Sequence, residues 1–427
     1  MKRLSIALPL IFCALSQAQN KPEHWVAAWA TAQQAVRVAP PQIVVGGRAM
    51  PTPAGPVAPT APPGPGASFN NQTVRMIAHA SMGGSRVRIE LSDAVGTQAV
   101  TVGAAHIALR AKGSEIVPGT DRALTFHGAP GCTLRPGAST VSDPVDLNIP
   151  KLADLAVSLY FPGETGPPTS HSLGLHTTYI SQTGDFTAQP TIDGAATVAS
   201  YYYLASVDVL APAKSGVIVA LGDSITDGAR STPDTDHMWP ALLAARLQAD
   251  KATARFAIVN EGISGNQVLK DGAGIAAVAR FDRDVLDVPG VEWVMILESI
   301  NDIGAIARGG GPLTAADLIG ALDQMVEQAH MHGIKVAGCT LTPYGGAGYY
   351  SDAGEAIRSA VNDWIRKGGA FDAVVDFDAA VRDPANPKEF RADMHAGDHL
   401  HPSDAGYAVM ANSVDLSIFG GKPKKTK

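Results

Sequence analysis

The sequence predicts a two-domain protein in which an α/β domain, built on a five-stranded parallel sheet, follows an all-β, sandwich-like domain. The first reason is the length of 427 residues, which suits two or three domains. The second is composition, since 45% of the residues are hydrophobic and only 17% are charged, which supplies enough apolar material for sizeable cores. The third is a change of pattern near residue 210, where short alternating runs give way to strands that are apolar throughout.

Charge and hydropathy argue against two classes of protein. The net charge of −7 gives no broad cationic surface for a phosphate backbone, so we expect no nucleic-acid partner. Beyond the first twenty residues no apolar run reaches the ~18 residues that a membrane-spanning helix needs, so we expect no membrane span.

The first twenty residues form a pattern of their own: Lys2 and Arg3 precede an apolar run, and the small residues Ser16 and Ala18 follow it. This pattern is typical of a signal peptide, here over residues 1–18, and predicts a secreted or periplasmic protein.

The first domain, expected over residues 19–206, alternates apolar and polar residues in short runs separated by Gly and Pro. Such runs are typical of half-buried antiparallel strands, and their number predicts a β-sandwich. The predicted strands are 73–80, 86–91, 100–108 and 155–161. Residues 40–66 contain nine prolines, a composition that can form neither a helix nor a central strand. We expect a long surface loop there; a polyproline ligand for a partner is the alternative.

The second domain, expected over residues 207–420, alternates apolar strands with amphipathic helices. This order predicts a parallel sheet covered by helices on both faces, with ligands bound at the carboxyl ends of the strands. The helical spacing is clearest around Leu318 and Leu322, after Thr314, which we expect to cap that helix. Residues 421–427 are expected to form a basic tail. The predicted strands are 217–221, 256–260, 291–297, 336–341 and 373–377, and a further helix is predicted over 239–248.

Four loops of the second domain carry polar residues that suit one reaction. Ser224 follows the first strand in a turn bracketed by glycines, although the same position would suit a simple helix N-cap. Gly265 lies in a glycine-punctuated loop after the second strand, and Asn301 follows the third. Asp398 and His401 lie beyond the last strand. Because parallel strands end at one edge of their sheet, we expect these residues to meet there.

These residue types supply the parts that acyl transfer requires. The Ser224 hydroxyl is too weakly acidic to attack a carbonyl unaided, so it needs a base such as His401, which titrates near neutrality. Asp398 would fix the tautomer of His401 and stabilise its cation. The negatively charged oxygen of the tetrahedral intermediate needs hydrogen-bond donors, and we expect the N–H groups of Ser224 and Gly265 and the side-chain amide of Asn301 to provide them.

At this point the second domain resembles a known family, the SGNH or GDSL-type hydrolases, over residues 216–418. The matching blocks are Gly222-Asp223-Ser224-Ile225, Gly265, Asn301-Asp302 and Asp398-x-x-His401-Pro402. The resemblance implies a flavodoxin-like, three-layer α/β/α fold without metal or cofactor, and hydrolysis of esters of carbohydrates, lipids, aryl alcohols or thiols. It implies Ser224 as nucleophile, Gly265 and Asn301 as oxyanion donors, and Asp398 and His401 as the rest of the triad.

The first domain contributes a second resemblance. Residues 25–34 and the sandwich-like region are similar to a two-domain bacterial branch that includes acylhydrolases encoded beside xylan-degrading enzymes. This resemblance implies an acyl ester of a plant polysaccharide as substrate, within the wider expectation of a small-molecule or polysaccharide ester. We therefore predict a secreted serine esterase for short acyl groups such as acetyl; a lipase or an arylesterase of the same family is the alternative.

One position departs from the family pattern. The block around Asn301 often reads Gly-x-Asn-Asp, whereas Ser299 holds the Gly position here. If the family needs that Gly for a positive φ or for space beside the acyl group, Ser299 would narrow the pocket toward short acyl chains. Glu298, which precedes it, is interpreted as an ordinary strand-end carboxylate that caps the loop.

Three rival readings remain open. His395, His399 and His401, with Asp393 and Asp398, form a cluster of residue types that could hold a metal. Residues 272–277 match a dinucleotide-binding G-x-G-x-x-A string, although they begin about a dozen residues after their strand. The third reading is a carbohydrate-binding module with an inactive hydrolase half, with sugar rings stacked on tyrosines. The tyrosines concerned are Tyr201, Tyr202, Tyr203, Tyr349 and Tyr350.

Overall fold

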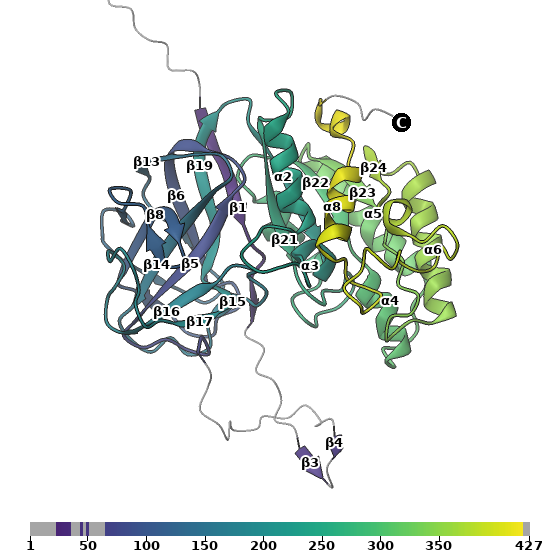
Figure 1. Ribbon diagram of the computed structural model, residues 1–427, viewed down its shortest axis with the longest axis horizontal. Coiled ribbons are helices and arrows are strands. Elements are labelled where there is room, and N and C mark those ends of the chain that lie inside the picture. Colours follow the sequence, from purple (N-terminus) through teal and green to yellow (C-terminus); the bar gives the residue numbers. More distant parts are fainter. Residues whose placement is uncertain (1–22, 36–42, 46–47, 51–64, 422–427) are drawn as a thin grey trace, which may run out of the picture.

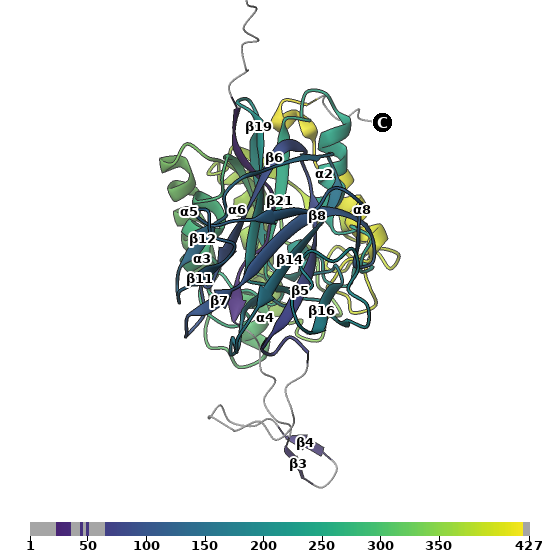
Figure 2. The same ribbon diagram turned by 90° about the vertical axis from the view of Figure 1, so that its left-hand side faces the viewer.

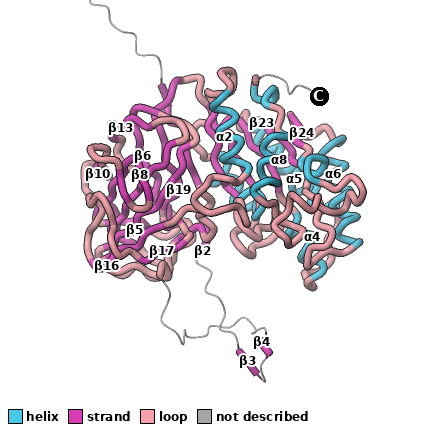
Figure 3. The backbone as a smooth tube through the Cα atoms, in the orientation of Figure 1, coloured by secondary structure: helices cyan, strands magenta, loops and turns pink. Residues whose placement is uncertain are grey.

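The computed structural model describes residues 23–35, 43–45, 48–50 and 65–421. One half of the molecule consists of strands and loops, whereas the other half combines helices with further strands (Figure 3). The chain passes from the first half to the second once, near residue 212 (Figure 1). The predicted signal peptide and residues 422–427 of the predicted tail lie outside the described residues. Within the described ranges, no helix has the length and apolar character needed to cross a bilayer.

The N-terminal half is built on two antiparallel sheets that pack face to face (Figure 2). Alternate residues of both sheets are buried in one core; Val87 and Ile89 come from one sheet and Val74 and Leu155 from the other. The first sheet contains β1 (Glu23–Ala30), β19 (Leu204–Pro212), β6 (Gly84–Ser92), β12 (Ser139–Val141) and β13 (Val145–Ile149). The second contains β10 (Arg122–Leu124), β8 (Ala104–Lys112), β14 (Ala153–Phe161), β5 (Gln72–Ala80), β16 (Thr178–Thr183), β17 (Ala196–Val198) and β9 (Glu115–Ile116).

Three small sheets complete this half. They are β11 (Cys132–Leu134) with β7 (Val100–Val102), β18 (Tyr201–Tyr202) with β15 (Thr169–His171) and β2 (Gln34–Ala35), and β3 (Ile43–Val45) with β4 (Arg48–Met50). The last pair falls within the proline-rich segment, most of which lies outside the described residues. The described part of that segment therefore includes a short hairpin, where the sequence predicted only loop.

Two details differ from the sequence prediction. The predicted strand 100–108 is broken at Gly103, because β7 pairs with β11 while β8 pairs with β14 in another sheet. A side chain at Gly103 would lie 3.1 Å from the Tyr160 ring, so this crossing point suits glycine. In addition, β19 runs through the predicted domain boundary at residue 206 and pairs with β1 and β6. The N-terminal sheet therefore extends to Pro212.

The C-terminal half is the predicted five-stranded parallel sheet. Its strand order, 2-1-3-4-5, is that of a flavodoxin-like fold. The strands, in spatial order, are β21 (Phe256–Gly262), β20 (Gly216–Gly222), β22 (Val291–Leu297), β23 (Lys335–Cys339) and β24 (Ala373–Val375). The helices are α1 (Ser224–Asp227), α2 (Trp239–Ala249), α3 (Ala277–Phe281), the π-helix η1 (Asp282–Leu286), α4 (Ile300–Ala307), α5 (Ala315–Met331), α6 (Asp352–Lys367), α7 (Phe377–Val381), α8 (Asp404–Ser413) and the 3₁₀ helix η2 (Leu416–Phe419).

Helices cover both faces of this sheet, which confirms the three-layer α/β/α architecture. On one face Ile218 of β20 packs with Trp239 of α2 and Tyr407 of α8. On the other face Val219 of β20 packs in the same core as Leu322 of α5. Burying an apolar side chain of this kind contributes about 1.5–3 kcal/mol to the free energy of folding, relative to leaving it exposed. The α5 helix begins as predicted at Thr314, where a capping box with Asp317 satisfies its first N–H groups.

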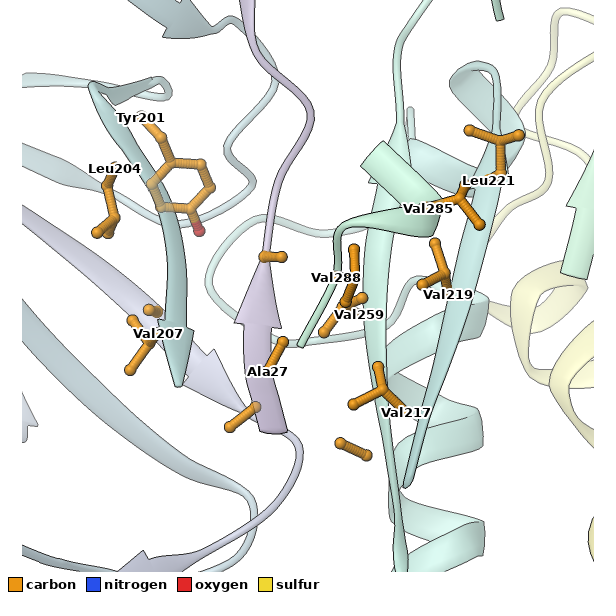
Figure 4. Close-up of a cluster of buried hydrophobic side chains, with 14 of the residues drawn as sticks. Ala27, Tyr201, Leu204, Val207, Val217, Val219, Leu221, Val259, Val285 and Val288 are labelled. Carbon is orange, nitrogen blue, oxygen red and sulfur yellow. The ribbon is translucent and has the colours of Figure 1, made fainter. Parts of the chain in front are cut away.

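The two halves share one hydrophobic core. Ala27 of β1 lies between Val207 of the N-terminal sheet and Val217, Val219 and Val259 of the parallel sheet (Figure 4). The edge strand β21 is covered here, because its Ile258 N–H donates to the Ser81 hydroxyl over 3.1 Å. A buried apolar interface of this kind opposes independent domain motion. The N-terminal domain therefore forms part of the frame on which the loops of the parallel sheet rest.

Candidate active site

Three neighbouring strands of the parallel sheet, β21, β20 and β22, end level with one another. Gly222, the last residue of β20, is in register with Gly262 of β21 and with Leu297 of β22. The loops that carry Ser224, Gly265 and Asn301 therefore leave the same edge of the sheet, as the sequence predicted. A side chain at Gly222 would lie 2.6 Å from the backbone oxygen of Leu297, so the close approach of these strand ends depends on glycine.

Ser224 begins α1 directly after the first of these strands. The sequence left open that Ser224 was only the N-cap, but the N-cap is Asp223, whose carboxylate accepts the Ile225 N–H over 2.9 Å. Gly228 ends this one-turn helix with φ +105°, a conformation that glycine adopts without strain. The Ser224 hydroxyl is therefore free of capping and available for another partner.

That partner is His401. The Ser224 Oγ and the His401 Nε2 are 2.8 Å apart, and the His401 Nδ1 lies 2.7 Å from the Asp398 Oδ2. The other oxygen of Asp398 accepts the backbone N–H groups of His401 and Leu400. Burial alone would raise the pKa of Asp398, but its hydrogen bonds with His401 and Leu400 lower it to about 2. Asp398 is therefore an ionised acceptor near neutral pH, which places a proton on Nδ1 and leaves Nε2 to accept one from Ser224.

The loop that carries His401 is fixed at both ends. His395 and Pro402 form an isolated β-bridge, and the Ala396 N–H donates to the His401 carbonyl over 2.9 Å. Ser403 then caps α8 through the Gly406 N–H, close to the helix start expected from the sequence. The imidazole is thereby held toward Ser224 by structure on both sides.

The predicted oxyanion donors lie on the two neighbouring loops. Gly265 has φ +82°, in a turn where the Asn266 N–H donates to the Ile263 carbonyl. Asn301 lies in the first turn of α4 and is 8% exposed; its Nδ2 has no hydrogen-bond partner among the described residues. A buried amide donor without a protein partner is costly unless a ligand oxygen uses it. This is the environment expected of a group that stabilises negative charge on a substrate.

Two carboxylates, for which sequence reasoning predicted no role, connect these loops. Asp227 of α1 accepts both the backbone N–H and the hydroxyl of Ser264, over 2.8 and 2.6 Å. Asp302 of α4 accepts the N–H groups of Val268 and Leu269 over 2.8 and 3.1 Å. The loop after β21 is therefore tied to α1 on one side and to α4 on the other, which fixes the separation of the three donor positions.

Arg280 is a further residue that sequence reasoning missed. Its fully buried guanidinium donates to the carbonyls of Gly222 and Glu261, to the Asn266 side chain and to Asp284, over 2.7–3.1 Å. It therefore joins the ends of β20 and β21 to the loop that carries Gly265. The signal in the sequence was an arginine inside the apolar stretch 275–281, since a charge in such a stretch needs buried partners.

The buried carboxyl groups behind the site are shifted toward their neutral forms. Burial raises the pKa of Asp223 to about 7, against the hydrogen bond from the Ile225 N–H, which favours the charged form. Burial and the nearby Asp223 raise the pKa of Glu298 well above its usual range. Glu298 accepts the Ser299 N–H over 3.1 Å, so it does cap the loop, but it is a buried group (2% exposed) rather than an ordinary strand-end carboxylate.

Ser299 adopts the backbone conformation that makes glycine usual at this position. It has φ +108° and ψ −17°, in the region that L-residues rarely enter. The residue is fully buried, and its hydroxyl has no hydrogen-bond partner within the described part of the chain. Ser299 therefore carries backbone strain beside Asn301.

The rival readings find less support in the geometry. The donor atoms of the predicted metal cluster, His395, His399, His401, Asp393 and Asp398, do not gather as a ligand set in the described ranges; one other group does. That group is His79, Asp154 and Asp236, in which the Arg110 guanidinium also contacts Asp154 over 3.0 Å. Because Asp154 is already paired with the Arg110 guanidinium, we interpret this group as an ion-pair network rather than a metal site.

The nucleotide and carbohydrate-module readings also meet obstacles. The 272–277 string lies in the connection between β21 and α3, well beyond the end of β21 at Gly262, and so does not form the turn that cradles a phosphate. Tyr201, Tyr202 and Tyr203 are at most 4% exposed and belong to the core. Tyr349 and Tyr350 are half-buried.

Together, the α/β/α fold and this constellation at the carboxyl edge of the sheet define a hydrolase. Residues 220–409 match the GDSL-like Lipase/Acylhydrolase family. The match spans most of the α/β domain, and the protein is a carboxylic ester hydrolase.

Solved structures give further similarities, each spanning about half of this chain. A lipolytic protein of the G-D-S-L family from Desulfitobacterium hafniense is 24% identical over 47% of this chain and 97% of that chain, with a TM-score of 0.36. A GDSL-like lipase from Bacteroides thetaiotaomicron is 22% identical over 47% and 87%, with a TM-score of 0.35. A catalytic mutant of an acetylxylan esterase from Geobacillus stearothermophilus is 22% identical over 50% and 97%, with a TM-score of 0.38. No protein of curated function matches the chain significantly.

Proposed function

We propose that this protein is an exported serine esterase that removes short acyl groups, such as acetyl, from polysaccharides or oligosaccharides of plant origin. The observation that carries the proposal is the pair of contacts from Ser224 Oγ to His401 Nε2 and from His401 Nδ1 to Asp398 Oδ2, at 2.8 and 2.7 Å. Export rests on the leader-like pattern of residues 1–18.

In the proposed reaction, Ser224 attacks the ester carbonyl while His401 takes the hydroxyl proton at Nε2. The N–H groups of Ser224 and Gly265 and the Asn301 amide hold the oxyanion; each such donor is typically worth about 10²–10³ in turnover. His401 then returns its proton to the leaving alcohol, and the acyl group stays on Ser224. In the second half-reaction, water gives a proton to His401 and attacks the acyl group, and His401 returns the proton to Ser224 Oγ as the acid leaves.

The preference for short acyl groups rests on the crowding around Asn301. Ser299 fills the position of the family glycine two residues before it. Gly304, one helical turn after Asn301, has the Tyr349 ring 2.7 Å from where a Cβ would lie. Both features place side-chain atoms close to the first turns of α4, which carries Asn301, and this supports a preference for short acyl chains. The polysaccharide substrate rests on the similarity of residues 25–34 and the sandwich domain to acylhydrolases encoded beside xylan-degrading enzymes.

The proposal is tested with p-nitrophenyl esters of two to twelve carbons and with acetylated xylan oligomers. We expect kcat/KM to be highest for acetate and to fall with chain length, and acetate to be released from the oligomers. Ser224→Ala should lower turnover by several orders of magnitude, whereas Ser359→Ala, an exposed serine of α6, serves as the matched control. Rates that rise with chain length would instead indicate a lipase, and a Ser224→Ala variant keeping more than about a tenth of the rate would contradict the nucleophile.

A further inference from the structure

A buried ion pair connects the N-terminal domain to the catalytic edge of the parallel sheet. His171, the last residue of β15, places its Nε2 3.0 Å from the Asp227 Oδ1, and both side chains are 3% exposed. Asp227 lies on α1, the helix that begins with Ser224. We propose that His171 is a positioning residue for ester hydrolysis, which holds the loop of the oxyanion donor Gly265 in place through Asp227; the inference rests on the function proposed above.

The contacts of Asp227 explain how a residue of another domain can act on this loop. One oxygen of Asp227 faces His171, and the other accepts the N–H and the hydroxyl of Ser264 over 2.8 and 2.6 Å. Ser264 directly precedes Gly265, so the carboxylate that orients the loop is itself oriented by His171. Without His171, Asp227 would be a buried carboxylate with one oxygen unpaired, free to turn away from Ser264 or to take up a proton.

The geometry also fixes the protonation state of His171. Its Nδ1 lies 2.9 Å from the Ala32 carbonyl, and its Nε2 faces the carboxylate of Asp227. Both partners only accept hydrogen bonds, so both ring nitrogens must donate, and the ring is an imidazolium. Burial works to lower the pKa of His171, but the charge and hydrogen bond of Asp227 outweigh it and raise the pKa. The charged groups that act on the ring are Asp227 and, with opposite sign, Arg280.

A second contact holds the same stretch of the α/β domain. The Gln34 Nε2 of β2 donates to the Ala273 carbonyl over 2.7 Å, in the segment that follows the loop of Gly265. The Gln34 Oε1 in turn accepts the N–H and the hydroxyl of Ser172, next to His171, over 3.2 Å. The small sheet of β2, β15 and β18 therefore contacts the active-site half at two points, Asp227 and Ala273, on either side of Gly265 in the sequence. This gives a role to the segment 25–34, which the reaction itself does not use.

Such support matters because the donor geometry is demanding. Catalytic groups must be held within roughly 0.5 Å of their productive positions. Gly265 lies in a loop with φ +82°, outside regular secondary structure. Loss of one oxyanion donor typically costs about 10²–10³ in turnover, so its partial misplacement should cost somewhat less. Because the oxyanion forms only in the reaction, the loss should fall on kcat rather than on KM.

The test compares His171→Ala and His171→Gln with His106→Ala, which removes a His–Asp pair inside the N-terminal domain. With p-nitrophenyl acetate, we expect His171→Ala to lower kcat by about 10–100-fold and to change KM by less than about three-fold. His171→Gln, whose amide can still donate to Asp227, should recover most of kcat. His106→Ala should leave kcat and KM unchanged. Thermal unfolding of each variant shows whether the folded fraction accounts for the change.

Folded His171→Ala protein with wild-type kcat would overturn the proposal, as would an equal loss in His171→Gln and His171→Ala. If His171→Ala does not fold, Gln34→Ala decides: a loss confined to kcat supports positioning from the N-terminal domain, and an unchanged kcat overturns it. A folded wild-type protein that hydrolyses no ester contradicts the proposed function instead, so the two failures can be told apart.

Discussion

Two His–Asp pairs contact Ser224 or the helix that it begins, and they differ in almost everything except their composition. His401 and Asp398 are three residues apart on one loop, and their side chains are 18% and 32% exposed. His171 and Asp227 come from different domains, and both side chains are 3% exposed. The first pair is open to substrate and solvent, whereas the second is enclosed.

What each pair can do depends on the partner of the histidine ring nitrogen that does not face the aspartate. In His401 it faces the Ser224 hydroxyl, which can either donate or accept, so the ring can gain and lose a proton. In His171 it faces the Ala32 carbonyl, which only accepts, so this nitrogen must donate as well. The same residue pair is thus suited to proton transfer in one setting and to holding two elements together in the other.

The largest difference should appear when each histidine is removed. We expect His401→Ala to lower kcat by about 10⁴–10⁶, the range for loss of a triad base, with little change in the unfolding temperature because this loop is partly exposed. His330→Ala, at an exposed His–Asp pair joining α5 to Asp372, is the control and should leave kcat unchanged. Steady-state kinetics with p-nitrophenyl acetate and thermal unfolding measure both quantities. If His401→Ala lowered kcat no more than His171→Ala does, the proposed difference between the two pairs would be contradicted.

Arg280 also supports the loop of Gly265, through its contacts with Asn266 and with the strand ends at Gly222 and Glu261. Arg280→Met removes the charge that Asp284 and Glu298 face and the donors to Gly222, Glu261 and Asn266. Breaking a buried pair in this way typically costs about 3–5 kcal/mol, so we expect the free energy of unfolding to fall by that amount. Urea denaturation measures it. Arg255→Met, at a pair with Glu292 that is about 40% exposed, should cost less than about 1 kcal/mol.

The two pairs should also stabilise the protein over opposite pH windows. The pKa of Asp398 is lowered to about 2, so its contribution is present above the ordinary carboxyl pKa and is lost as the pH falls through the lowered value. The pKa of His171 is raised above 6.5, so its contribution is complete at lower pH and is lost as the pH rises through the raised value. We expect the unfolding temperature to fall at alkaline pH in the wild type and to fall less in His171→Gln. Parallel curves for the two proteins would contradict this.

The sequence was most informative where function depends on short motifs at strand ends. Strand register could be inferred from the apolar runs, so the meeting of Ser224, Gly265 and Asn301 at one edge was predictable. The ion pair between His171 and Asp227 was not, because it depends on how two domains pack and its partners are 56 residues apart. Arg280 shows the same limit, since an arginine in an apolar stretch indicates burial without naming its partners. Contacts between loops and domains are set by tertiary packing, which local patterns do not encode.

The smallest expected effect concerns Ser299, where the family pattern and the backbone disagree. A non-glycine residue at φ +108° typically stores about 1–3 kcal/mol of strain, and here a buried hydroxyl without a partner adds to the cost. A glycine at this position would remove both the strain and the unpaired hydroxyl. It would also lose more conformational entropy on folding than serine does, which costs roughly 0.5–1 kcal/mol. We therefore expect Ser299→Gly to raise the free energy of unfolding by about 1 kcal/mol in urea denaturation. If Ser299 also limits the acyl group, the same variant should accept butyrate and hexanoate esters better relative to acetate. Ser299→Ala removes only the hydroxyl and keeps the strained Cβ, so it should leave chain-length preference closer to that of the wild type; an equal shift in both variants would assign the effect to the hydroxyl rather than to the backbone.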